Sequence, residues 1–139
     1  MNALGRHILA EYYTCDTTLL NSSELLESCM KNAVRASGAT IIDSTFHTFS
    51  PHGVSGVIVI AESHMAIHTW PEYGYAAVDF FTCGDRVDPW KAFEYMNELL
   101  KPVRHSTKEL QRGLLGPEPH NLLQVQLASK EKISSVSPP

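Results

Sequence analysis

This 139-residue sequence is poor in the features that mark several large classes of protein. Its 11 Lys and Arg residues are outnumbered by 15 Asp and Glu residues, which argues against nucleic acid as the main partner because phosphate binding depends on clustered basic side chains. No window approaches the roughly 18 consecutive apolar residues that a membrane span requires. The amino terminus also has neither the charged start nor the apolar centre of a secretion signal. We therefore expect a cytoplasmic protein with no membrane partner.

Motifs for metals, nucleotides and classical hydrolases are missing as well. Cys15, Cys29 and Cys83 form no Cys-x-x-Cys pair, so they predict neither a disulfide framework nor a zinc knuckle. His64 and His68 have metal-ligand spacing only on a helix, whereas this segment lies among predicted strands. There is no Gly-rich phosphate loop and no Gly-x-Ser-x-Gly elbow. We expect no metal site, no nucleotide cofactor and no serine-hydrolase triad.

Enough apolar residues are present, at 43% of the total, to form one hydrophobic core. We therefore predict one domain over residues 1–115. Residues 116–139 are rich in Pro and Ser and cannot bury enough apolar surface to become ordered on their own. They predict a flexible carboxy-terminal tail.

Periodicity predicts two helices among six strands. A capping box at Asn21 and Glu24 predicts the start of the first helix, which Gly38 ends. Asp88 and Pro89 predict the start of the second helix. Strands are predicted in segments rich in β-branched and aromatic residues: 6–15, 40–49, 54–61, the central stretch 61–72, 75–83 and 103–112.

This order of elements predicts an α+β fold, a two-layer α/β sandwich in which two helices cover one face of a mostly antiparallel sheet. In the first strand, His7, Leu9 and Glu11 then share one face, and Ile8 and Ala10 share the other. The face without helices also needs cover. We therefore predict a homodimer packed sheet to sheet.

A polar stretch follows the apolar strand at 54–61 and holds the most distinctive residues of the chain. Together with four other motifs it resembles the prokaryotic S-adenosylmethionine decarboxylase proenzyme family in order and spacing, from about Leu4 to Phe93. The motifs are Glu62-Ser63-His64, Ile67-His68-Thr69-Trp70-Pro71-Glu72, Asp79-Phe80-Phe81-Thr82-Cys83-Gly84, Leu4-Gly5-Arg6-His7 and Gly53-Val54-Ser55-Gly56-Val57.

The resemblance implies that the chain cleaves itself. The Ser63 hydroxyl would attack the Glu62 carbonyl and turn the peptide bond into an ester. His68 would then remove the α proton of Ser63, so that Glu62 leaves by β-elimination, and Ser55 would support this step. Hydrolysis of the dehydroalanine would leave a pyruvoyl group at residue 63, separating a chain of residues 1–62 from a chain of residues 63–139.

The pyruvoyl group made from Ser63 would be the cofactor, and the resemblance implies that no metal is needed. Its ketone would form a Schiff base with S-adenosylmethionine and accept the electrons freed as carbon dioxide leaves. Cys83 would then protonate the substrate carbon. The product would be the aminopropyl donor for spermidine synthesis. In the same family, Phe49 and Trp70 would pack against the adenine and Glu72 would hold the ribose hydroxyls.

Two alternatives remain open at this point. Family members that decarboxylate arginine share the processing residues, so the chain could be a pyruvoyl arginine decarboxylase. It could also be an unprocessed relative that serves as a binding or regulatory subunit. The presence of Ser63, His68 and Cys83 argues against the second alternative, because a chain freed from catalysis has no need to keep all three.

Overall fold

The chain folds into one six-stranded sheet with helices against one of its faces. The computed structural model describes residues 3–117, so most of the predicted tail at 116–139 lies outside the described residues. The strands are β1 (Ala3–Tyr13), β2 (Ile41–Thr48), β3 (Val54–Ile60), β4 (Ser63–Trp70), β5 (Tyr75–Cys83) and β6 (Arg104–Leu114). The helices are α1 (Thr17–Leu20), α2 (Ser23–Ala36), the 3-10 turn η1 (Pro71–Tyr73) and α3 (Pro89–Leu100).

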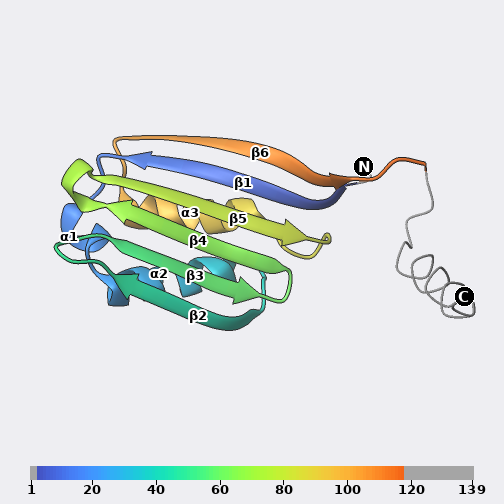
Figure 1. Cartoon of the computed structure of the whole chain (residues 1–139). Helices are drawn as coiled ribbons and strands as arrows, with labels where there is room; N and C mark the ends of the chain where they lie inside the picture. Colours follow the sequence, from blue (N-terminus) through green and yellow to red (C-terminus); the bar gives the residue numbers. More distant parts are fainter. Residues whose placement is uncertain (1–2, 118–139) are drawn as a thin grey trace, which may run out of the picture.

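The strand order is β2-β3-β4-β5-β1-β6, and every neighbouring pair is antiparallel. Strands β2 to β5 follow the chain, whereas β1 lies between β5 and β6. The two long helices, α2 and α3, lie behind the sheet in Figure 1 and leave its front face open. The predicted α+β sandwich, with its antiparallel sheet, is therefore confirmed.

Alternation along β1 follows the predicted division between the two faces. Ile8 and Ala10 are buried beneath the helices, whereas His7, Leu9 and Glu11 lie half-buried on the open face. The core between sheet and helices holds large side chains from both layers, including Tyr12, Leu26, Met30, Ile58, Ile67, Phe80 and Met96. The open face therefore carries a row of polar side chains on a rigid support.

The start of α2 differs from the predicted capping box. Ser22 is the N-cap, and its hydroxyl accepts a hydrogen bond from the Leu25 amide at 3.2 Å. Asn21 instead ends the short helix α1, which the sequence did not predict, and its side chain accepts a hydrogen bond from the Gly53 amide at 2.9 Å. Serine caps the free amides at a helix start as well as asparagine does, so Ser22 can take this role. The Asn21 side chain is then available to bind the β2–β3 loop.

The start of α3 agrees with the prediction. The Asp88 side chain accepts a hydrogen bond from the Trp90 amide at 3.1 Å, and Pro89 occupies the first helical position. Lys101 ends the helix in the left-handed conformation, at φ 46°. Within residues 3–117, no helix is long and apolar enough to cross a membrane.

Candidate active site

Ser63 follows the tightest connection in the sheet. Strands β3 and β4 are joined by the two residues Ala61 and Glu62, and Ile60 pairs with Ser63 across the turn. Ser63 has φ 147°, a backbone region that is occupied almost only by glycine. A side chain held there carries roughly 1–3 kcal/mol of strain. The strain therefore lies directly beside the peptide bond that the resemblance identifies as the cleavage site.

Hydrogen bonds hold both ends of Glu62. The Cys83 amide donates to the Glu62 carbonyl oxygen at 3.1 Å. The Thr40 amide donates to Glu62 Oε1 at 3.1 Å, and the Ala61 amide donates to the Thr40 carbonyl at 2.9 Å. A carbonyl that accepts a fixed N–H is polarised toward attack at its carbon. The backbone of β5 thus activates the carbonyl next to Ser63.

Cys83 is the last residue of β5, and its side chain is exposed. The preceding residue, Thr82, pairs directly with Ser63 across β4 and β5. Thr82 is 1% exposed, and its hydroxyl oxygen has no hydrogen-bond partner among the described residues. The structure therefore brings Glu62, Ser63 and Cys83 together at one end of the sheet.

The remaining predicted site residues lie together elsewhere. Ser55 Oγ and His68 Nδ1 are 2.7 Å apart, on the neighbouring strands β3 and β4. They line a hollow of about 390 Å³, here called the Ser55–His68 hollow. Its walls also include all three residues predicted to bind substrate, namely Phe49, Trp70 and Glu72.

His52 is a member of this hollow that the sequence analysis missed. It lies in the loop between β2 and β3, and its Nε2 atom pairs with Glu72 Oε2. The contact fixes the Glu72 carboxylate at the rim of the hollow. The two residues are twenty positions apart in the sequence, and no motif connected them.

One chain does not bring the two groups of residues together. Ser63 and His68 stand at opposite parts of β4, where they pair with Thr82 and Ala77. At about 3.3 Å per strand residue, five residues separate them by about 16 Å. His68 therefore does not reach the α proton of Ser63 within its own chain.

A polar cluster occupies the open face between these two groups. His7 Nε2 and His64 Nε2 each lie 2.8 Å from Asp79 Oδ2, and Arg112 Nη1 lies 3.0 Å from His7 Nδ1. The ligand atoms of His7, His64 and Asp79 lie within 4.8 Å of one another, close enough to consider a metal ion. However, Arg112 can only donate, so His7 Nδ1 accepts and Nε2 carries the proton that is donated to Asp79. A nitrogen that donates in this way has no lone pair for a metal.

A second polar pair lies farther along the same face. The Tyr75 hydroxyl donates to Glu11 Oε2. Burial and the neighbouring Glu11 carboxylate raise the pKa of Tyr75 above its ordinary value. Tyr75 also packs against Trp70, with ring centroids 5.3 Å apart, so it supports one wall of the Ser55–His68 hollow.

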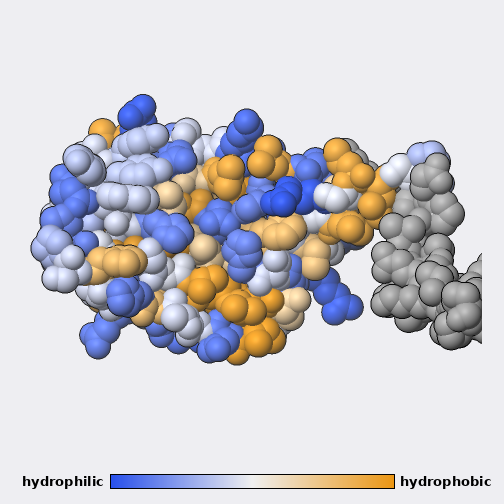
Figure 2. Space-filling model, in the orientation of Figure 1, coloured by the Kyte–Doolittle hydropathy of each residue, from blue (hydrophilic) through white to orange (hydrophobic). Residues whose placement is uncertain are grey.

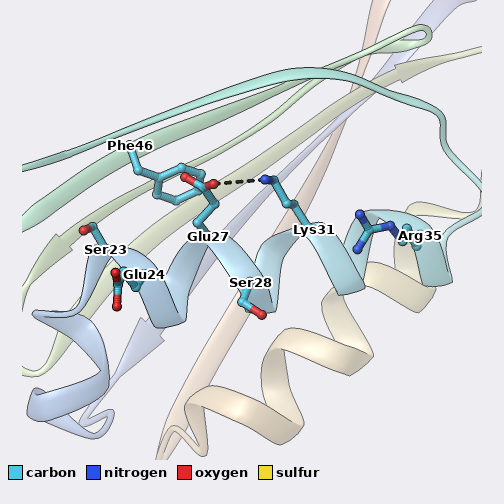
Figure 3. A pocket seen from close by; sticks show the side chains of 7 residues that line it. All are labelled: Ser23, Glu24, Glu27, Ser28, Lys31, Arg35 and Phe46. Atoms are coloured by element: carbon cyan, nitrogen blue, oxygen red, sulfur yellow. Dashed lines mark hydrogen bonds and ion pairs between the residues drawn. The ribbon is translucent and has the colours of Figure 1, made fainter.

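A different hollow, between α2 and β2, contains none of the predicted site residues (Figure 3). It measures about 360 Å³, with Phe46 on the strand side and polar side chains of α2 on the other. Within it, Lys31 Nζ donates to Glu27 Oε1 at 2.9 Å, one turn away on the helix. Two of the charged side chains in this hollow therefore already pair with each other.

Comparison with known proteins places this arrangement in a family. The model of the S-adenosylmethionine decarboxylase family matches residues 6–113. The chain belongs to this family. The match includes every predicted site residue, from Phe49 to Cys83, and the family resemblance stated from the sequence is thereby confirmed.

Several relatives support the same assignment. The chain is 61% identical over 113 residues to the S-adenosylmethionine decarboxylase proenzyme of Thermosipho africanus, covering 81% of this chain and 87% of that one. It is 53% identical over 134 residues to the proenzyme of Fervidobacterium nodosum, covering 92% and 98%. The crystal structure of the adenosylmethionine decarboxylase from Aquifex aeolicus is 37% identical, with a TM-score of 0.79, covering 87% of this chain and all of that one.

A more distant structure shares the fold of this chain. The Trypanosoma brucei AdoMetDC-delta26 monomer has a TM-score of 0.56 at 15% identity. This match covers 73% of the present chain but only 44% of the trypanosomal one, and it shows similarity of fold alone. The S-adenosylmethionine decarboxylase fold of the present chain thus recurs within a longer protein.

Proposed function

We propose that this chain is a self-processing decarboxylase that acts on S-adenosylmethionine through a pyruvoyl group formed from Ser63. Membership of the S-adenosylmethionine decarboxylase family makes it an enzyme and implies the pyruvoyl cofactor. One structural observation supports the proposal most directly. The strained Ser63 follows a carbonyl, that of Glu62, which is already hydrogen-bonded by the Cys83 amide. This arrangement suits attack by a serine hydroxyl on the preceding carbonyl.

Processing would begin when Ser63 Oγ attacks the Glu62 carbonyl carbon. Negative charge then develops on the Glu62 carbonyl oxygen, and the Cys83 amide stabilises it without having to move. The bond to the Ser63 nitrogen breaks, this nitrogen takes up the hydroxyl proton as a free amine, and an ester forms. His68 would then take the α proton of Ser63 as the Glu62 carboxylate leaves from its β carbon, while the hydrogen bond to Ser55 fixes the orientation of the imidazole.

In the mature enzyme, the pyruvoyl ketone supplies the electron-accepting carbonyl on which decarboxylation of an amino acid depends. Cys83 Sγ would hold the proton that is delivered to the substrate α carbon. Its position beside residues 62 and 63 supports this role, because the Cys83 amide and the Glu62 carbonyl are 3.1 Å apart. Phe49 and Trp70 would pack against the adenine, and Glu72 would accept hydrogen bonds from the ribose.

A homodimer would join the two separated groups of residues. A two-fold axis that lies between two facing sheets and runs across the strands reverses strand direction. If the axis passes near the middle of β4, Ser63 of one protomer faces His68 of the other. The same operation forms a second, equivalent site. The separation of about 16 Å within one chain therefore supports a shared site.

The open face is suited to such packing. Figure 2 shows it as hydrophobic patches mixed with hydrophilic side chains. Its main charged groups already pair within the chain, since Asp79 accepts from His7 and His64, and Glu11 accepts from Tyr75. Polar groups that keep their partners can be buried at low cost. Facing sheets in proteins pack about 10 Å apart with their side chains interdigitated, so the substrate would occupy the Ser55–His68 hollow at one end of the sheet.

A cytoplasmic location stays a prediction from the sequence.

Two measurements test the proposed function. The intact mass under denaturing conditions should show two chains separated between residues 62 and 63, the second lighter by one ammonia than its serine form. The purified protein should then release carbon dioxide from S-adenosylmethionine. Release from arginine alone would overturn the substrate, and a single uncut chain without activity would favour the binding or regulatory subunit.

A further inference from the structure

Trp70 lies at the end of a row of side chains that crosses four neighbouring strands, β4, β5, β1 and β6, on the open face (Figure 1). Trp70 of β4 is directly opposite Tyr75 of β5, and Tyr13 of β1 is directly opposite Arg104 of β6. The Tyr75 and Tyr13 rings join the two pairs, because they stack with centroids 5.4 Å apart. We call these four residues the Trp70–Arg104 row.

Each member of the row contacts the next. The Trp70 and Tyr75 ring centroids are 5.3 Å apart, and the two ring planes are tilted by 34°. The Arg104 guanidinium carbon lies 4.0 Å from the centre of the Tyr13 ring, a distance at which a cation is attracted to an aromatic face. Aromatic pairs that face each other across neighbouring strands stabilise one another. Contacts therefore run from the edge strand β6 to Trp70.

Tyr75 is also held at its hydroxyl end. The hydroxyl donates to Glu11 Oε2, on the strand that carries Tyr13 as well. Burial and the hydrogen bond to Glu11 raise the pKa of Tyr75, so the hydroxyl stays protonated and can donate throughout the neutral pH range. The Tyr75 ring thus packs against two aromatic neighbours and is hydrogen-bonded at its tip. These contacts fix its orientation.

Only one end of the row reaches the Ser55–His68 hollow. Trp70 lines the hollow and is 42% exposed, whereas Tyr75 and Tyr13 are half-buried and do not line it. A partly exposed side chain that must be immobilised when a ligand binds lowers the affinity. Because Tyr75 already holds the indole, a flat ring can stack on the exposed part of Trp70 without that loss.

Tyr75 can therefore act on the substrate only through Trp70. We propose that Tyr75 is a positioning residue for the base of the substrate: with Tyr13 and Arg104 behind it, Tyr75 holds the Trp70 indole in the orientation against which adenine stacks. This inference rests on the proposed function, in which Trp70 packs against the adenine of S-adenosylmethionine. Flat aromatic rings attract one another when they stack with an offset, so a fixed indole suits a purine.

Phe49, the other aromatic wall of the hollow, has less support. Within residues 3–117, the one aromatic contact found for it is with His47, whose ring centroid is 4.6 Å away and meets Phe49 edge-on. His47 is itself exposed. Phe49 and Trp70 are similarly exposed, so the row behind Trp70 makes it the more firmly held of the two walls.

Time-resolved fluorescence anisotropy measures how firmly the indole is held. The chain has two tryptophans, so Trp90→Phe leaves Trp70 as the reporter in the full-length protein. We expect the Trp70 indole to rotate with the protein as a whole, and Tyr75→Leu to add a fast internal motion. Tyr73→Leu is the matched control and should add none, because Tyr73 is 77% exposed and lies outside the row.

Adenosine binding and steady-state kinetics measure the consequence for the substrate. In Tyr75→Leu, the Kd of adenosine and KM for S-adenosylmethionine should each rise about fivefold, with little change in kcat, because the base loses a fixed wall. Tyr75→Phe keeps the ring and should recover most of this loss. Tyr13→Leu should raise both constants about twofold through the row alone, and it keeps the test decisive if Tyr75→Leu fails to fold.

Three outcomes overturn the proposal. A Trp70 indole that moves freely while Tyr75 is present would show that the row does not hold it. Unchanged Kd and KM in both Tyr75→Leu and Tyr13→Leu would make the row a structural feature only. Equal losses in Tyr73→Leu would reduce the effect to a general loosening of this end of the sheet.

Adenosine binding also separates this inference from the proposed function. One chain forms the hollow, so the binding of adenosine requires neither self-cleavage nor decarboxylation. Adenosine binding that depends on Tyr75, in a protein that releases no carbon dioxide from S-adenosylmethionine, would support the positioning role and overturn the proposed activity alone.

Discussion

The backbone amide of Cys83 donates a hydrogen bond, at 3.1 Å, to the carbonyl oxygen of Glu62. The contact joins the end of β5 to the turn before β4. Cys83 can therefore contribute separately to self-cleavage and to decarboxylation. Its amide contacts the carbonyl of the bond to be cleaved, whereas its thiol is exposed beside that bond. A side-chain substitution therefore changes one contribution and leaves the other.

Cys83→Ala should still cleave itself but should decarboxylate poorly. The alanine amide remains in place for the Glu62 carbonyl, whereas the proton donor is lost. General acid catalysis contributes roughly 10²- to 10⁴-fold, so carbon dioxide release should fall about 100-fold or more. Intact mass and carbon dioxide release on the same sample measure the two effects. A variant that stays as uncut as Ser63→Ala would contradict this division.

A shared active site predicts complementation between two inactive chains. Ser63→Ala and His68→Ala should each remain uncut when expressed alone. When they are expressed together, a mixed dimer unites the intact Ser63 of one chain with the intact His68 of the other. Random pairing places about half of the His68→Ala chains in mixed dimers, and these should be cleaved.

The complementation experiment distinguishes the dimer from a self-contained chain. If each chain used its own His68, mixing would restore nothing, since each chain lacks one of the two groups. Co-expression of Ser63→Ala with Ser55→Ala tests whether Ser55 acts from the same chain as His68. It should also restore cleavage, because Ser55 and His68 lie 2.7 Å apart in the same hollow.

The fold was predictable because local patterns determine most of it. Alternation in β1 separated Ile8 and Ala10 from His7 and Glu11, and Asp88 with Pro89 marked the start of α3. Insertion of β1 between β5 and β6 was not predictable from these patterns, because strand neighbours far apart in sequence carry no local signal. The prediction of Asn21 as the helix cap was wrong for a related reason. Both residues suit the role, and a contact with the distant Gly53 decided between them.

The candidate site was predictable as a set of residues but not as an arrangement. The resemblance supplied Ser63, His68 and Cys83, and the structure brings only Ser63 and Cys83 close together. A linear motif gives the number of residues between Ser63 and His68. It does not show that an extended strand holds them about 16 Å apart. His52 was missed because its contact with Glu72 crosses between two loops.

His52 should act as a positioning residue for Glu72. His52→Ala should raise KM for S-adenosylmethionine about tenfold, the effect of losing about 1.4 kcal/mol of binding, because the carboxylate is no longer fixed. Self-cleavage should proceed at its normal rate, and kcat should change little. Steady-state kinetics on fully processed protein measure the two constants, and His52→Gln, which keeps a donor, should recover part of the loss. An unchanged KM would exclude the role.

The cysteines should differ in reactivity in the folded protein. Burial raises the pKa of Cys15 to about 11, so at pH 8 only about one thiol in a thousand is the reactive thiolate. Cys83 is exposed and accessible to reagent. Brief treatment with iodoacetamide followed by peptide mass spectrometry should show Cys83 modified and Cys15 unmodified. Denaturation should make Cys15 reactive, and equal labelling of both before denaturation would refute the difference.

The strain at Ser63 can be measured with two substitutions that both prevent cleavage. Ser63→Ala and Ser63→Gly lack the hydroxyl, so each protein stays as one chain and can be compared without mixtures. Alanine keeps the cost of φ 147°, roughly 1–3 kcal/mol, whereas glycine adopts this angle freely. Glycine loses roughly 0.5–1 kcal/mol through the greater freedom of its unfolded chain.

The difference between these two terms predicts that Ser63→Gly is the more stable variant, by about 1 kcal/mol. For a chain of this length, that corresponds to a rise in Tm of about 4 °C relative to Ser63→Ala. Ala61→Gly, in the adjacent turn where no positive φ is required, is the control and should lower Tm. If Ser63→Gly melted at or below Ser63→Ala, the backbone at residue 63 would be unstrained before cleavage. Activation would then rest on the Cys83 amide alone.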